Sequence, residues 1–211
     1  MYSLLVRLTK MNRRDFMKLS GLTGLALVLG KFGSGCDERD DGNPQNTVQE
    51  KKLSDFPYFL ANANNEFDGY VIVGDSAPGS DVVGAIDVIT GIQNTGIVIP
   101  SDLAKLASEV ASLDKHAILF GRNSTYAPGE ANPFLDYEQI PVLNAGEGYL
   151  ALEEQNGLYR IIVSGFEALD VRKAGRVLSE HCADSTKYDL AGRKVLVQGT
   201  SLTDLSTQVL E

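Results

Sequence analysis

The sequence predicts an α/β fold in which a mixed β-sheet is flanked by helices. Between residues 70 and 197, short runs rich in Val, Ile, Leu and Tyr alternate with longer segments that carry an apolar stripe at helical spacing. Two of these strand-then-helix units repeat after 89 residues. The dipeptide Asn156-Gly157 predicts a β-hairpin, because it supplies the positive φ angles of a tight turn. A hairpin beside crossover helices makes the sheet mixed.

Nine elements are expected in this part of the chain. The strands are predicted at 70–73, 96–99, 117–120, 149–152, 158–163 and 194–197. The helices are predicted at 80–90, 102–113 and 168–181, each with one apolar face.

The 89-residue offset indicates two related β-loop-α halves. The identical pairs are Tyr70/Tyr159, Ile72/Ile161, Asp81/Asp170, Val82/Val171, Ala85/Ala174 and Val88/Val177. Any strand followed by an amphipathic helix shows some of this agreement, so chance similarity stays the alternative. In both halves an aspartate precedes the apolar stripe, where an acid caps or complements a helix N-terminus. We therefore assign Asp81 and Asp170 to capping rather than to catalysis.

A twin-arginine export signal is predicted near the N-terminus. Arg13 and Arg14 are adjacent, Phe16 and Lys18 follow them, and residues 19–29 form a Gly- and Leu-rich apolar run. Paired cations before such a run are typical of an export address and unusual at the start of a core helix. The signal predicts an extracytoplasmic location.

The apolar run is too short for a permanent membrane span, since a bilayer core needs about 20 apolar residues in a helix. Residues 1–35 are therefore assigned to the signal peptide. Met11 stands just before the arginines, so either Met1 or Met11 is the start, and in the second case residues 1–10 are an upstream extension.

Cys36 leaves two interpretations open for the end of the signal. It follows the small residues 33–35 and precedes a polar segment, which favours a lipoprotein whose Cys36 thiol is acylated and anchors the chain to the membrane. Such signals normally carry leucine where this chain has Gly33. The alternative is ordinary cleavage at the small-residue pattern of 33–35.

Residues 36–55 are predicted to be a disordered acidic tether, and residues 56–211 to form the α/β domain. The first 36 residues hold six of the 19 basic and one of the 28 acidic residues, so residues 37–211 carry 13 basic and 27 acidic ones, a net charge of −14. This charge repels nucleic acid, which is not an expected partner. Cys182 is the only other cysteine, so no intramolecular disulfide is expected if Cys36 is lipidated or removed.

The motif Val73-Gly74-Asp75-Ser76 resembles the nucleophile block of GDS-type esterases. A nucleophilic Ser76 would need a histidine to accept its proton and an acid to orient that histidine. In those enzymes the acid and the base come as Asp-x-x-His near the C-terminus. Here neither His116 nor His181 has an aspartate three residues before it. A structural role is therefore expected for both histidines, and no catalytic residue is assigned.

Other candidate sites carry weaker signals. The glycine-rich turns 74–79 and 121–129 follow strands and could hold an anion, but no G-x-G-x-x-G and no P-loop lysine is present. No metal-ligand spacing is found, and no cofactor or metal is expected. Asn123-Ser124-Thr125 is the only glycosylation sequon, and an exported chain could carry glycan at Asn123.

The segments 71–87, 160–178 and 199–205, taken together and in this order, resemble the surface-layer (S-layer) proteins of methanogen-type archaea. Residues 71–87 resemble the family's N-terminal strand, small-residue turn and Ser-Asp-Val-Val helix. Residues 160–178 resemble its C-terminal strand and Asp-x-Arg-x-Ala-x-x-Val-Leu helix, and residues 199–205 its closing Gly-Thr-Ser-Leu-Thr-Asp. The order also agrees, and the likeness covers 68–205. Family members are several times longer, use a conventional export signal, and usually have a Gly-Gly-Pro-type turn where this chain has residues 119–123.

The resemblance implies a short, non-enzymatic cell-envelope module with no catalytic residues to carry over. We therefore expect an exported, surface-anchored glycoprotein or lipoprotein that is structural or mediates interactions. Its expected partners are the membrane, through Cys36, and other envelope proteins or further copies of itself. An exported ligand-binding protein, or an esterase that uses Ser76, is the alternative.

Overall fold

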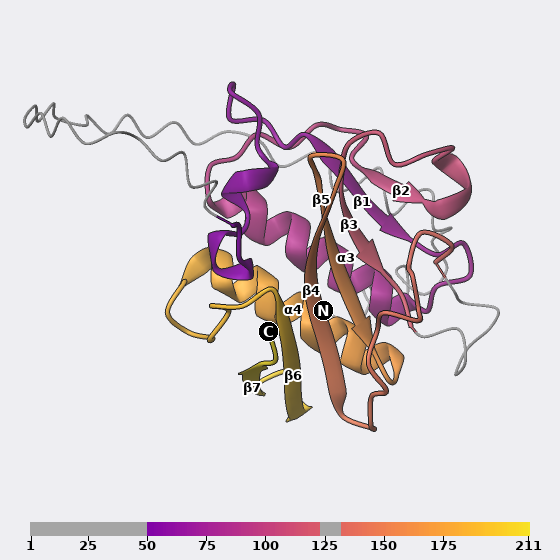
Figure 1. Cartoon of the computed structure of the whole chain (residues 1–211), viewed down its shortest axis with the longest axis vertical. Coiled ribbons are helices and arrows are strands. Elements are labelled where there is room, and N and C mark those ends of the chain that lie inside the picture. Colours follow the sequence, from indigo (N-terminus) through magenta and orange to yellow (C-terminus); the bar gives the residue numbers. More distant parts are fainter. Residues whose placement is uncertain (1–49, 123–131) are drawn as a thin grey trace, which may run out of the picture. The chain divides into compact units, whose positions relative to one another are not determined.

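A seven-stranded mixed sheet organises the folded part of the chain, as the computed structural model shows (Figure 1). The structure describes residues 50–122 and 132–211, and residues 51–211 form one compact unit. The strands are β1 Gly69–Val73, β2 Ala104–Leu106, β3 His116–Phe120, β4 Glu147–Gln155, β5 Leu158–Gly165, β6 Lys194–Ser201 and β7 Asp204–Val209. Their order is β2-β1-β3-β5-β4-β6-β7. The pairs among β2, β1, β3 and β5 are parallel and the remaining pairs are antiparallel, which confirms the predicted α/β class.

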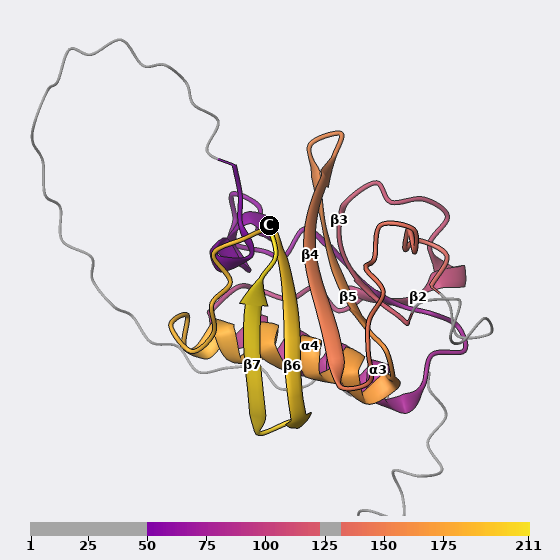
Figure 2. The ribbon, with the colours of Figure 1, turned by 60° about the horizontal axis from the view of Figure 1, so that its bottom comes forward.

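Two helices, α3 (Gly79–Asn94) and α4 (Ala168–Ala183), cover one face of the sheet (Figure 1, Figure 2). Their buried residues share one apolar cluster with alternate residues of the strands, such as Val71 and Val163. The bounds of α4 are those of α3 plus 89, and each helix follows a parallel strand. The sequence offset therefore corresponds to two equivalent β-α units of the fold.

Glycines allow α3 and α4 to pack closely. A Cβ atom on Gly91 would lie 2.9 Å from the Cα of Ser179, and one on Gly175 would lie 3.1 Å from the carbonyl oxygen of Gly84. Gly91 has no room for a side chain, and a Cβ at Gly175 would require its neighbours to shift. The two β-α units therefore meet through backbone contacts between their helices.

Irregular chain covers the opposite face of the sheet. A second apolar cluster there combines sheet residues such as Ile72 and Tyr149 with Ala107, Leu135 and Leu143 from the segments after β2 and before β4. Alternation along each strand therefore divides the apolar residues between two layers. The hairpin β4–β5 turns at Asn156 and Gly157, whose φ angles of 55° and 77° confirm the predicted tight turn.

The predicted helix 102–113 is wrong. The segment forms the short edge strand β2, then a 3₁₀ turn, η3 (Ala107–Glu109). Its apolar spacing is helical, but Leu103 packs in the helix-side cluster whereas Ala107 packs in the opposite one. The chain passes around the sheet edge at this point, and tertiary burial overrides the local pattern.

The predicted strand 96–99 is also wrong. Gly96 takes a φ angle of 88° after α3, and Val98 forms only an isolated bridge with Glu66. In addition, the sequence interpretation missed β7. Its alternating pattern is largely polar, since only Leu205, Thr207 and Val209 are partly buried.

The folded unit starts earlier than residue 56. Leu53, in the 3₁₀ turn η1 (Leu53–Asp55), is fully buried, and its amide donates to the carbonyl of Gly192. The last residues of the predicted tether therefore belong to the domain. Phe56-Pro57 is a cis peptide bond.

Candidate functional site

The carboxyl ends of β1 and β3 form the most conspicuous candidate site. The connection from β1 leads through α3 to β2 on one side, whereas β3 leads on to β4 and β5 on the other. Open α/β sheets bind ligands at such a switch point. The glycine-rich turns predicted from the sequence, at 74–79 and from Gly121, both start here.

Ser76 lies at this edge with an exposed side chain. Next to it, Asp75 accepts a hydrogen bond of 2.6 Å from the Ser108 hydroxyl. The Ser108 amide also points to Asp75, at 3.4 Å. Asp75 therefore holds the segment after β2 against the turn that carries Ser76.

Neither histidine is placed to activate Ser76. His116 pairs with Gly69 at the amino end of β1, so about 13 Å of strand separates it from the edge where Ser76 lies. Its Nδ1 accepts a 2.9 Å hydrogen bond from the Tyr159 amide, and burial lowers its pKa below 6.5. His181 is buried on α4, with its Nε2 3.2 Å from the carbonyl oxygen of Ser54. Both histidines hold backbone in place, as the sequence predicted.

Asn132 closes the switch point between β1 and β3. Its fully buried side chain donates to the carbonyl oxygens of Ile72, at 3.2 Å, and Phe120, at 3.1 Å, and its Oδ1 accepts from the Phe134 amide at 3.1 Å. The backbone N–H of Asn132 donates to the Tyr137 hydroxyl oxygen at 2.6 Å. Asn132 thus occupies the position between the strands where a ligand would approach. The sequence reasoning missed it, since a single Asn-Pro pair carries no signal of this role.

The N-terminus of α3 adds a buried acid to the same edge. Asp81 lies in the first turn of the helix and is fully buried. Burial raises the pKa of Tyr137 to about 12, and the charge of Asp81 adds to this increase. Asp81 thus lies where an acid complements a helix dipole. The predicted capping by Asp81 is not confirmed, because the N-cap residue of α3 is Pro78 and the helix has no side-chain cap hydrogen bond.

Asp170 fills the equivalent position in α4 and caps that helix. Its Oδ2 accepts from the Glu167 amide at 3.1 Å and from the Gly146 amide at 3.2 Å. Its Oδ1 lies 2.8 Å from Lys173 Nζ, which also donates to the carbonyl of Gly199 at 2.7 Å. The capping role is confirmed. The sequence reasoning missed Lys173, although a cation three residues after an acid within an apolar helix was a usable signal.

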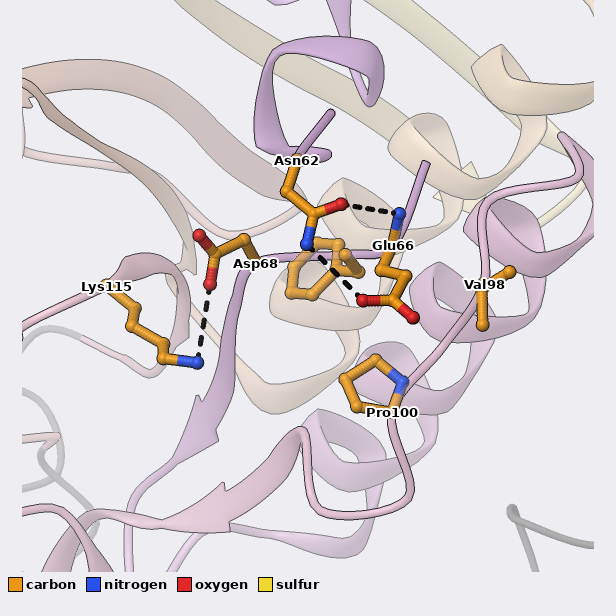
Figure 3. Close-up of a pocket in the computed structure, with 7 residues that line it drawn as sticks. Asn62, Glu66, Asp68, Val98, Pro100 and Lys115 are labelled. Atoms are coloured by element: carbon orange, nitrogen blue, oxygen red, sulfur yellow. Dashed lines mark hydrogen bonds and ion pairs between the residues drawn. The ribbon is translucent and has the colours of Figure 1, made fainter. Parts of the chain in front are cut away.

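A second depression lies at the amino end of β1 (Figure 3). It has a volume of about 180 Å³ and is lined by Asn62, Glu66, Phe67, Asp68, Val98, Pro100 and Lys115. Lys115 Nζ lies 3.3 Å from Asp68, and the hydrogen bond to Asp68 raises the pKa of the lysine. Because Asp68 already neutralises this lysine, the depression offers no free cation among its described lining residues for an anionic ligand.

The residues predicted for export and modification lie outside the described part of the chain. These are Arg13, Arg14, Phe16, Lys18, Cys36 and Asn123. Within residues 50–122 and 132–211, no cluster of three or more His, Cys, Asp or Glu side chains could hold a metal ion. Cys182 is partly buried, and burial raises the pKa of its thiol to about 12. No helix in these ranges has the length and apolar character needed to cross a bilayer.

Comparison with known proteins adds no assignment, because no protein-family model and no curated protein matches the chain.

Proposed function

We propose that the chain is an exported, surface-anchored cell-envelope protein, a non-catalytic structural or interaction module related to archaeal S-layer proteins. The observation that carries this proposal is the order of signals in the sequence. The twin arginines, the apolar run and Cys36 precede the acidic residues 37–50, and the folded unit follows from residue 51. An anchor followed by a folded acidic unit is the arrangement expected of a protein displayed on a membrane.

The S-layer resemblance supports the second part of the proposal. Residues 71–87 span most of β1 and the first half of α3, residues 160–178 span most of β5 and α4, and residues 199–205 span the β6–β7 turn. The first two segments are the equivalent β-α units whose helices meet at Gly84 and Gly175. The resemblance thus falls on the framework of the domain.

The non-catalytic character is supported by the contacts of the candidate side chains. Asp75, Asn132 and both histidines form hydrogen bonds that hold neighbouring segments of the chain. Ser76 has neither histidine near it. These hydrogen bonds give each of the four residues a structural role in the fold.

Mass spectrometry of the intact native protein, with cell fractionation, tests the proposal. We expect a membrane-bound product that begins at Cys36, with added acyl mass and with glycan on Asn123. The Arg13→Lys/Arg14→Lys variant should leave the precursor in the cytoplasm, whereas a Lys31→Arg control, also within residues 1–35, should be exported normally. An unmodified product free in the medium, or a cytoplasmic wild type, would contradict the proposal.

The exposed position of Ser76 at the switch point keeps a ligand-binding or esterase function as the second candidate. A panel of p-nitrophenyl esters tests it with the wild type, Ser76→Ala and a Ser80→Ala control. Hydrolysis that only Ser76→Ala abolishes would favour the esterase. An inactive wild type would exclude it for these substrates.

A further inference from the structure

The two edges of the sheet are protected very differently. β2 is three residues long and carries Lys105, and short edge strands with lysine resist pairing with other chains. β7 is six residues long, and Asp204, at its start, is its only charged residue. It has no lysine, arginine or proline. No strand among the described residues pairs with its outer side, where it is the outermost strand beside β6 (Figure 2).

The pairing of β7 with β6 determines which of its backbone groups are available. The Leu210 amide donates to the Lys194 carbonyl, and Leu196 and Gln198 pair with Gln208 and Ser206 further along. Since antiparallel partners alternate between bonded and non-bonded pairs, Gln208 and Ser206 direct their backbone groups to β6. Leu205, Thr207 and Val209 therefore direct their N–H and C=O groups to the open edge.

We propose that β7 pairs antiparallel with β7 of a second copy of this chain, about a two-fold axis at Thr207. In this register Leu205 of one copy lies opposite Val209 of the other, and Thr207 lies opposite its own equivalent. The three open residues of each strand then form about six backbone hydrogen bonds. The result is a continuous sheet of two domains.

The side chains of β7 suit this register. Leu205, Thr207 and Val209 are partly buried, and Leu205 and Val209 already pack against the helix-side core. Pairing Leu205 with Val209 of the second copy extends that apolar layer across the axis. On the other face, exposed Ser206 lies opposite exposed Gln208. Neither position brings like charges together, so the exposed side chains of the strand are complementary to each other. On the helix-side face the Thr207 hydroxyl accepts from the Asp189 amide at 3.1 Å.

The acidic surface opposes this association and gives it a salt dependence. Residues 37–211 carry a net charge of −14, so two copies repel each other at low ionic strength. The dissociation constant of the dimer should therefore decrease as salt screens the charge.

The experiment places charges on the two exposed positions without disturbing the core. In Ser206→Lys/Gln208→Lys, lysine faces lysine at both pairs. In the matched control Ser206→Lys/Gln208→Glu, lysine faces glutamate. Sedimentation equilibrium of the full-length chain in density-matched detergent should show a wild-type dimer. The dissociation constant should rise about tenfold in the first variant and stay near the wild-type value in the second.

Monomeric wild type at high salt, or equal weakening of both variants, would overturn the inference. The inference gives the proposed envelope module a second copy of itself as partner, and in this respect it rests on the proposed function. The two can still fail separately: a dimer of a protein found in the cytoplasm would contradict only the function, and a monomeric protein on the cell surface only the dimer.

Discussion

Asp170 and Lys173 form a buried ion pair one helical turn apart, with 2.8 Å between the carboxylate and the ammonium and each side chain only 3% exposed. The pair joins three parts of the fold, because Asp170 accepts from the Gly146 amide before β4 and Lys173 donates to the Gly199 carbonyl in β6. Gly148 and Gly165 let α4 approach the sheet here, since a Cβ on either would lie 2.6 Å or less from backbone atoms of Asp170 or Val171. The pair thus anchors the second β-α unit to the antiparallel half of the sheet.

Asp170→Asn should lower the free energy of unfolding by about 3 kcal/mol, because it leaves the Lys173 ammonium buried without its counter-charge. The double variant Asp170→Asn/Lys173→Met should lose less than the sum of the two single changes. Urea denaturation of the two single variants and the double variant measures these changes in the free energy of unfolding. The control Arg176→Met removes an exposed partner of Glu180 on the same helix and should change the value by less than about 1 kcal/mol. Additive effects at Asp170 and Lys173 would contradict the coupling.

Gly91→Ala should destabilise the domain by about 1–3 kcal/mol, although alanine is the better helix former. The new Cβ would lie 2.9 Å from both the Cα and the carbonyl oxygen of Ser179, so α3 and α4 must move apart. Gly79→Ala is the matched control on the same helix, because a Cβ there meets nothing within 4 Å. Thermal and urea unfolding should therefore show that Gly91→Ala lowers the stability, whereas Gly79→Ala raises it or lowers it clearly less. Equal effects would mean that the helix contact does not limit stability.

His116 should make the domain less stable as the pH falls below about 6.5. Burial lowers its pKa in the folded state, so the unfolded chain binds the proton more readily. Stability is therefore full above the unfolded pKa and decreases as the pH falls from 6.5 toward the folded value. Protonation also removes the Nδ1 acceptor used by the Tyr159 amide. Urea denaturation at pH 7.5 and 5.5 should show a smaller change for His116→Asn, whose amide oxygen accepts at any pH, than for wild type.

Asn132→Asp should lower the free energy of unfolding by about 3 kcal/mol. A carboxylate cannot donate to the carbonyls of Ile72 and Phe120, and at this fully buried position it would face two acceptors. The control Asn64→Asp changes an exposed turn residue and should have a much smaller effect. Similar unfolding midpoints for the two variants would show that Asn132 does not hold β1 and β3 together.

The sequence determined the fold class and most of the regular elements, and it predicts an export signal. These depend on local information: the apolar period of the two helices, the Asn156-Gly157 turn, and the cations and apolar run of the signal. The 89-residue offset even matched the bounds of α3 and α4. Local patterns suffice where neighbouring residues share one environment.

Only the tertiary structure decided which face of the sheet each segment covers. Leu103 packs in the helix-side cluster and Ala107 in the opposite one, so the segment with the helical pattern forms a strand and a turn at the sheet edge. The polar side chains of Asn132 and Lys173 can be buried because carbonyl groups 60 and 26 positions away in the sequence accept their hydrogen bonds. β7 exists because β6 supplies its ladder, and its open edge follows from the strand order. Burial and pairing between distant residues determine such features, and no local pattern records them.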